Sequence, residues 1–201
     1  MIKKAKQELV KSAQRAYTRG IQTGNGGNIS VRVPGQDWMA VKPSGVSFVE
    51  CTEENLVVTD FDGAVVEGTL KPTREALLHG VLYRNVPWVN GIIHTHSPWT
   101  IAWSYTRKDI PLITQHSLGK IGPRIATLLF ESFKVTGKEV PEVLGLFQEH
   151  PETQAFVLLG HGIVALGKDV LEAEHTAELV EETAQIAWLH EIGKGLNIIQ
   201  K

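Results

Sequence analysis

The sequence contains one cysteine, Cys51, and no long run of apolar residues. A single cysteine excludes a disulfide within the chain, and a membrane-spanning helix would need about 20 apolar residues in succession. The first residues, MIKKAKQELVKSAQRAYTRG, also lack the apolar stretch of a secretory signal. We therefore expect a cytoplasmic protein that does not enter a membrane.

An excess of charge of one sign is missing as well. The 20 basic and 22 acidic residues give a formal net charge of -2, and the pI is about 6.4. Such a balance argues against nucleic acid as a partner, so any anionic ligand must be held by a local site. No repeat, low-complexity tract or linker interrupts the 201 residues, and one core suits this length. We expect a single domain over residues 1–201.

The spacing of apolar residues predicts a mixture of helices and strands. Helical spacing is found over residues 2–19, about 73–85, 98–105, within 126–133, 140–149 and 170 to about 192. Short apolar runs predict strands at 28–33, 37–45, 55–60, 64–68, 89–96, about 110–114 and 155–160. Thr73 and Ser97 are expected to cap their helices. The fold class is therefore α/β, with a central, mainly antiparallel sheet covered by helices.

Three histidines stand at the ends of apolar strands. His94 and His96 are two residues apart, so a strand sends both imidazoles to one face, and His161 ends the run FVLLGHG. Three imidazoles suit a catalytic zinc ion that keeps a fourth position open. The alternative, half-buried histidines satisfied by the backbone, stays open because the sequence does not make the two strands neighbours. We leave out of the metal site His150, His175, His190 and also His79, which shares a helix face with Glu75.

Three short segments have the composition of anion-binding turns. They are GNGGNIS at residues 24–30, KPSG at 42–45, and Thr73-Arg74 at a predicted helix start. GNGGNIS does not match the phosphate loop GxxxxGK[ST], and each segment alone also fits an ordinary turn. Together they predict a composite anion site. Glu75, in the first turn of the predicted helix, is by itself explained by the helix dipole.

The segments GNGGNIS, KPSG, KPTRE, LLHGVLY, HTHS and LLGHGIVALG resemble the class II aldolase/adducin family in order and spacing over nearly the whole chain. The resemblance implies a metal-dependent aldehyde-lyase with one Zn²⁺ per chain, a small phosphorylated sugar as substrate, and a homotetramer. It makes Glu75 the acid/base, which also ligates zinc before substrate enters. The zinc ligands it implies are His94, His96 and His161. The phosphate-binding residues it implies are Gly27, Asn28, Ser44, Gly45, Thr73 and Arg74.

Two features depart from the family pattern. Many relatives have a second serine where this chain has Arg74. The tyrosines that fuculose-phosphate aldolases use have no counterpart, and Gln115 or His116 is the candidate for the first of those positions.

We expect an aldolase that cleaves a ketose phosphate through a zinc-stabilised enediolate. A sugar-phosphate 4-epimerase or a 3-oxo-acid-phosphate decarboxylase of the same family is the enzymatic alternative. A non-catalytic, adducin-like binding module is the alternative of another class.

Overall fold

A single β-sheet organises the computed structural model, which describes residues 1–130 and 135–199. Within these residues the sheet has eight strands in the order β4-β3-β2-β1-β5-β8-β7-β6. Every neighbouring pair is antiparallel except β6 with β7. The predicted α/β class with a mainly antiparallel sheet is confirmed. The strands are β1 (Asn28–Arg32), β2 (Trp38–Val41), β3 (Val57–Asp60), β4 (Val65–Glu67), β5 (Gly91–Thr95), β6 (Ala126–Leu128), β7 (Ala155–Leu158) and β8 (Gly162–Gly167).

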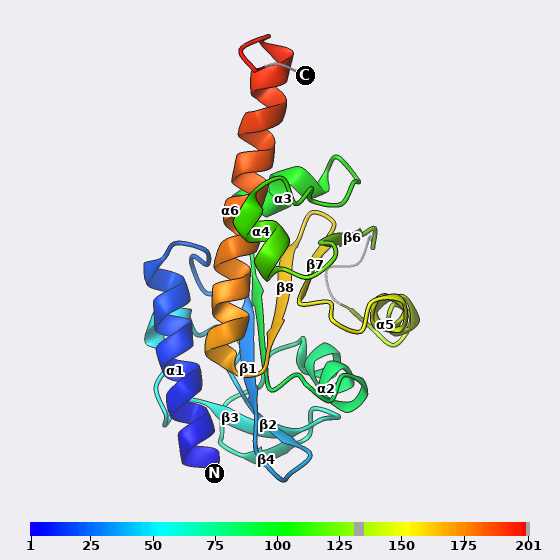
Figure 1. Cartoon of the computed structure of the whole chain (residues 1–201). Helices are drawn as coiled ribbons and strands as arrows, with labels where there is room; N and C mark the ends of the chain where they lie inside the picture. Colours follow the sequence, from blue (N-terminus) through cyan, green and yellow to red (C-terminus); the bar gives the residue numbers. More distant parts are fainter. Residues whose placement is uncertain (131–134, 200–201) are drawn as a thin grey trace.

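Helices cover both faces of this sheet (Figure 1). The long helices α1 (Ile2–Thr18) and α6 (Val170–Gly195) lie on one face, and α2 (Ala76–Asn85) and α5 (Val140–Glu149) lie on the other. Alternate residues of the strands feed the two core clusters, so that Ile93 packs with α1 and α6 while its neighbour Ile92 packs with α2 and α5. Three short helices complete the described chain: η1 (Phe48–Glu50), α3 (Pro98–Ser104) and α4 (Gln115–Lys120).

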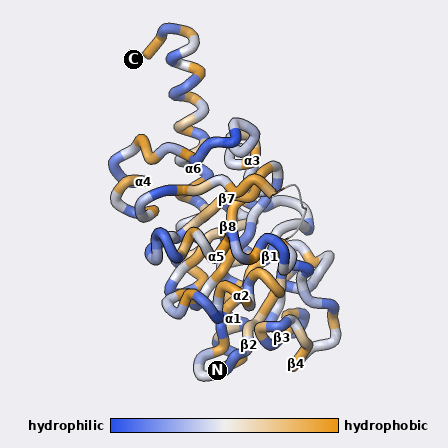
Figure 2. Tube along the Cα trace, turned by 90° about the vertical axis from the view of Figure 1, so that its right-hand side faces the viewer, coloured by the Kyte–Doolittle hydropathy of each residue, from blue (hydrophilic) through white to orange (hydrophobic). Residues whose placement is uncertain are grey.

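The last turns of α6 extend past the sheet and carry the C-terminal end of the chain away from it (Figures 1 and 2). Apolar side chains such as Leu189 and Leu196 are exposed there, and apolar and polar residues alternate along this part of the tube in Figure 2. The helices of the described chain include none with the length and apolar character needed to cross a membrane.

Two predicted elements between α3 and α5 are wrong. The strand expected at 110–114 is reduced to one bridge, in which Ile110 pairs with Ile125, and α4 follows. The helix expected within 126–133 is replaced at its start by β6, and residues 131–134 lie outside the described residues. The apolar run of β6 pairs in parallel with β7, and this long-range pairing outweighs the local helical spacing.

The start of α3 differs from the prediction in the group that caps it. The Ser97 hydroxyl donates a hydrogen bond to the Ile21 carbonyl at 2.8 Å and does not cap the helix. The amides of Trp99 and Thr100 instead donate to the carboxylate of Glu181 on α6, at 2.8 and 2.9 Å. A carboxylate suits this place because it faces the positive end of the helix dipole. These bonds join α3 to α6 and so fix the chain that follows β5.

Candidate active site

One pocket of about 370 Å³ is lined by all the metal-ligating and anion-binding residues that the sequence analysis selected. It lies where the ends of β1 and β5 meet the turn between β7 and β8 and the start of α2. Its lining is Asn25, Gly26, Gly27, Asn28, Lys42, Ser44, Gly45, Thr73, Arg74, Glu75, His94, His96 and His161. The two groups of residues, imidazoles and anion-binding segments, therefore share one cavity.

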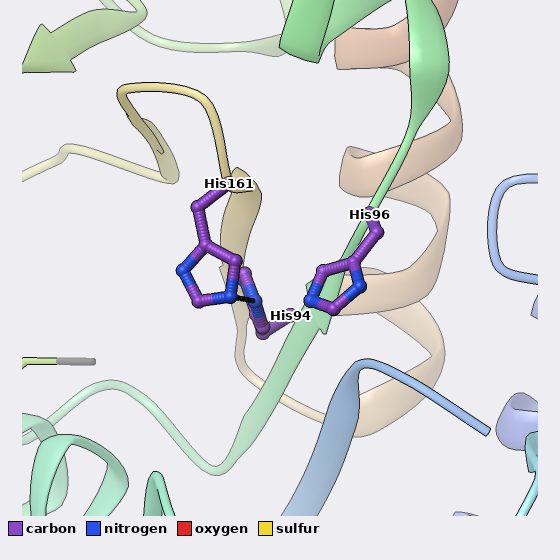
Figure 3. A group of neighbouring side chains, drawn as sticks. All are labelled: His94, His96 and His161. Atoms are coloured by element: carbon purple, nitrogen blue, oxygen red, sulfur yellow. Dashed lines mark hydrogen bonds between the residues drawn. The ribbon is translucent and has the colours of Figure 1, made fainter. Parts of the chain in front are cut away.

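The three histidines converge, as predicted, because β5 and β8 are neighbouring strands. Thr95 of β5 pairs with Ile163 of β8, which puts the end of β5 beside the turn that carries His161. Figure 3 shows the imidazoles of His94, His96 and His161 turned toward one another. One ligand atom from each ring lies within 4.8 Å of the others. The group is therefore a candidate metal centre.

Hydrogen bonding and spacing at the centre fit a tetrahedral metal ion. His94 Nδ1 donates to the Ile163 carbonyl at 2.7 Å, which leaves the lone pair of its Nε2 directed at the other rings. The distance from His94 Nε2 to His161 Nε2 is 3.3 Å. Two ligands at about 2.0–2.1 Å from a tetrahedral zinc ion would lie about 3.3–3.4 Å apart. The residues present therefore fit a bound divalent metal.

Burial keeps these imidazoles neutral. It lowers the pKa of His94 well below its usual value, with further lowering by the neighbouring His161 and His96. It lowers the pKa of His161 to about 4, again with a contribution from His96, and it lowers the pKa of His96. Neutral imidazoles have free lone pairs at neutral pH, so no proton has to leave before a metal binds.

The glycine-rich segment passes close to the histidines. A Cβ added to Gly26 would lie 2.7 Å from His96 Nδ1, and one added to Gly27 would lie 2.7 Å from the His94 carbonyl oxygen. Gly27 also has φ of +62°, a conformation that side chains disfavour. Glycine is therefore the residue that this approach requires. Gln22, which the sequence analysis did not select, supports the same region by accepting a hydrogen bond from the His96 amide at 2.8 Å.

The other two predicted anion segments lie side by side. The Ser44 amide donates to the Lys71 carbonyl at 2.9 Å, and the Ser44 hydroxyl donates to the Pro72 carbonyl at 2.9 Å. Thr73 is not the helix cap that was predicted, because α2 begins at Ala76 and its N-cap residue is Glu75. The Thr73 hydroxyl accepts from the Glu75 amide at 3.4 Å. This turn sets Glu75 one residue before the helix and 6% exposed, on the pocket wall.

Lys42 is a lining residue that lies in the predicted KPSG segment but was not itself selected as a site residue. Its ammonium donates to the carbonyls of Val46 at 2.6 Å and of Asn25 and Pro43 at 3.3 Å, and it lies 5.7 Å from the centre of the Phe48 ring. Burial lowers its pKa. Lys42 thus ties the glycine-rich segment to the KPSG turn. A lysine directly after the apolar run MAV was the available signal.

Gln115 and His116 are not at this pocket. Both are exposed at the start of α4, and His116 Nε2 lies 3.5 Å from Glu182 on α6. Neither is among the residues that line the cavity in the described part of the chain. Glu75 and the three histidines are therefore the candidate acid/base and metal-binding groups that this chain itself brings to the pocket.

Fold and site together define a candidate metalloenzyme of mixed α/β architecture. The family model for the class II aldolase and adducin N-terminal domain matches residues 7–188. The chain therefore belongs to the class II aldolase and adducin family.

Among curated relatives, the L-ribulose-5-phosphate 4-epimerase UlaF of Salmonella paratyphi A is 33% identical over 207 residues, which cover 98% of this chain and 90% of the relative. UlaF of Salmonella typhi matches with the same identity and coverage.

Solved structures agree with the fold. An L-fuculose 1-phosphate aldolase is 28% identical with a TM-score of 0.82, over 94% of this chain and 86% of the other. L-fuculose-1-phosphate aldolase from Thermus thermophilus, 24% identical with a TM-score of 0.81 over 94% and 95% of the two chains, supports the fold alone.

Proposed function

We propose that this chain is a divalent-metal enzyme that cleaves the carbon–carbon bond beside the carbonyl group of a small ketose phosphate. The observation that carries this proposal is the meeting of three imidazoles, one carboxylate and the anion-binding segments in one pocket of about 370 Å³. A pocket of a few hundred Å³ suits a small ligand.

The imidazole end is the reacting end in this proposal. His94, His96 and His161 would hold the ion, and three neutral imidazoles favour zinc. Such an ion supplies a Lewis acid that polarises a carbonyl group. Glu75 takes the proton of the substrate hydroxyl as the bond breaks. It returns that proton to the new alkoxide oxygen if the bond forms again, or to the carbon fragment that remains if the aldehyde leaves. Its place on the pocket wall, nearly buried, keeps water from competing for that proton.

The anion end binds and orients the substrate phosphate. Its donors are the backbone amides at Gly27 and Gly45, the Thr73 hydroxyl and the exposed guanidinium of Arg74. The Ser44 hydroxyl, which donates to the Pro72 carbonyl, would have to turn from it to join them. Arg74 adds a formal positive charge at the start of α2, where the helix dipole also favours an anion. Binding energy from the phosphate then holds the reacting carbons in place.

Two outcomes of this cleavage have separate support. The curated relatives at 33% identity bear the name of a 4-epimerase, in which the aldehyde turns over and the same bond forms again. The solved structure at 28% identity bears the name of an aldolase, in which the aldehyde leaves, and this is the outcome that the sequence analysis favoured. We place epimerisation first, because its support covers 98% of the chain at the higher identity.

A product assay with the zinc-loaded protein tests the proposal. L-ribulose 5-phosphate and L-fuculose 1-phosphate are incubated separately, and epimer and free aldehyde are measured by chromatography. We expect about one zinc per chain and turnover of one of the two sugars, with Glu75→Gln as the inactive control. If the protein took up no zinc when zinc was supplied and turned over neither sugar, the proposal would be contradicted and the adducin-like binding module would be favoured.

A further inference from the structure

A row of buried polar side chains runs from the pocket into the core beneath α2. On β1, Asn28, Ser30 and Arg32 alternate with Ile29 and Val31, and only the two apolar side chains join the cluster under α1 and α6. The polar face of β1 is thus turned toward α2. Asn28, at the pocket end of this row, lines the cavity and pairs with His94 on β5. A strand that places polar groups in a core needs partners for them.

Helix α2 provides those partners along one face. His79 and Tyr83 are four residues apart and both fully buried. The Ser30 hydroxyl lies 2.7 Å from His79 Nδ1 and 2.8 Å from the Tyr83 hydroxyl. Glu75 is one turn before His79, and the His79 amide donates to the Glu75 carbonyl at 3.1 Å. Glu75, His79 and Tyr83 therefore form a line that leads from the pocket inward.

The protons of this line can be assigned by counting donors. Tyr83 has one hydroxyl proton, and Ser30 Oγ is the hydrogen-bond partner that the described residues offer it. Tyr83 then donates to Ser30, and Ser30 donates its own proton to His79 Nδ1. Because His79 Nδ1 accepts this hydrogen bond, the ring's own proton is on Nε2. That N–H is buried and has no hydrogen-bond partner among the described residues.

We propose that His79 is a positioning residue whose Nε2–H, unpaired among the residues that the structure describes, reaches the carboxylate of Glu75 by a small rotation of the side chains and holds it in place at the pocket. Side chains of a helix lean toward its N-terminus, so the His79 ring extends over the turn that starts at Glu75. A carboxylate is an acceptor that commonly orients an imidazole N–H at such sites. The proposal rests on the role of Glu75 in the proposed function.

Two substitutions of His79 separate positioning from packing. In His79→Gln the side-chain amide keeps an N–H donor near the place of Nε2. In His79→Asn the polar group stays near Nδ1 and nothing reaches Glu75. We expect kcat to fall about 10- to 100-fold in His79→Asn, with KM and zinc content within about two-fold of the wild type, because the base is no longer aligned. His79→Gln should retain kcat within about five-fold. Equal losses in both variants, or an unchanged kcat in His79→Asn, would overturn the proposal.

Side-chain NMR of ¹⁵N-labelled histidine gives a readout that needs no activity. We expect His79 to be the Nε2–H tautomer, with an Nε2–H signal that moves in Glu75→Gln but not in the exposed control Glu142→Gln. An Nδ1–H tautomer, or a signal that ignores Glu75→Gln, would refute the assignment. Tyr83→Phe should reduce the tautomer preference, which keeps the test decisive if His79→Asn fails to fold. If no sugar phosphate were turned over, the proposed function would be contradicted, whereas the NMR signals would still test the contact between His79 and Glu75.

Discussion

Glu75 is the residue on which the proposed chemistry depends most. Its carboxylate is nearly buried on the pocket wall beside the three imidazoles. Glu75→Gln keeps the shape and removes the proton acceptor, so we expect kcat to fall by about 10²–10⁴-fold, as is typical for loss of a general base. Zinc content and thermal unfolding should stay close to the wild type, because the three histidines remain. Wild-type turnover in Glu75→Gln would show that another group transfers the proton.

His161 tests the metal centre independently of any substrate. Its Nε2 lies 3.3 Å from that of His94, and no cysteine is near to replace it because the only one, Cys51, is buried elsewhere. We expect His161→Ala to weaken zinc binding by more than about 100-fold, since a catalytic site has only three protein ligands. Elemental analysis after dialysis measures this, with the exposed His116→Ala as the matched control. Full zinc occupancy in both variants would disprove the ligand set.

Most residues that line the pocket could be selected from the sequence, but their supporting contacts could not. The histidines could be selected because strand periodicity puts His94 and His96 on one face, and strand ends expose them. Lys42 and Gln22 escaped selection, since what they do depends on carbonyls and amides brought near by distant segments. Sequence spacing contains no information on such contacts.

At the scale of elements, the glycine-rich segment before β1 controls how closely the chain approaches the metal ligands. Gly27→Ala would place a Cβ 2.7 Å from the His94 carbonyl oxygen, whereas a Cβ at Gly24 would meet nothing within 4 Å. Both glycines have positive φ, so Gly24→Ala measures the backbone strain alone, about 1–2 kcal/mol. We expect Gly27→Ala to lower the free energy of unfolding by at least about 2 kcal/mol more, as measured by urea titration. Equal losses in the two variants would contradict the close approach.

Elements with a strong local pattern were predicted well. The residues of α5 were predicted to the residue, and α1 and α6 nearly so, because each has apolar residues at helical spacing over several turns. The errors fall on short elements. The three residues of β6 are a strand because β7 offers them a partner. The sequence predicts one strand at 155–160 and none at 162–167, where the structure has β8 after the turn at His161. The secondary structure of a short apolar run depends on the segments that it pairs with or packs against.

For the whole molecule, buried histidines predict a loss of stability in acid. Burial lowers the pKa of His79 to about 3 and of His161 to about 4, whereas in the unfolded chain both titrate near about 6.5. The unfolded state therefore binds more protons below that pH. The stability that these neutral rings contribute is complete above about pH 6.5, and is lost as the pH falls toward 3 for His79 and 4 for His161. Each ring contributes a slope of at most about 1.4 kcal/mol per pH unit.

Urea unfolding of the chelator-treated protein between about pH 7 and about pH 4.5 measures this slope. We expect His79→Gln to reduce the slope of stability against pH by about the contribution of one buried histidine, because glutamine has no proton to gain. The exposed His175→Gln should leave the slope as it is. The same slope in wild type and His79→Gln would mean that His79 is already solvated in the folded chain.

The placement of the pocket at the seam between β1 and β5 has a consequence for how this protein can change. The anion-binding segments all precede residue 76, and the three imidazoles all follow residue 93. The substrate-binding segments and Glu75 thus lie in one stretch of the chain, and the metal-binding histidines lie in another. Recombination between homologues at the α2–β5 connection, near Pro87, would therefore exchange the substrate-binding segments together with Glu75 and keep the metal-binding histidines.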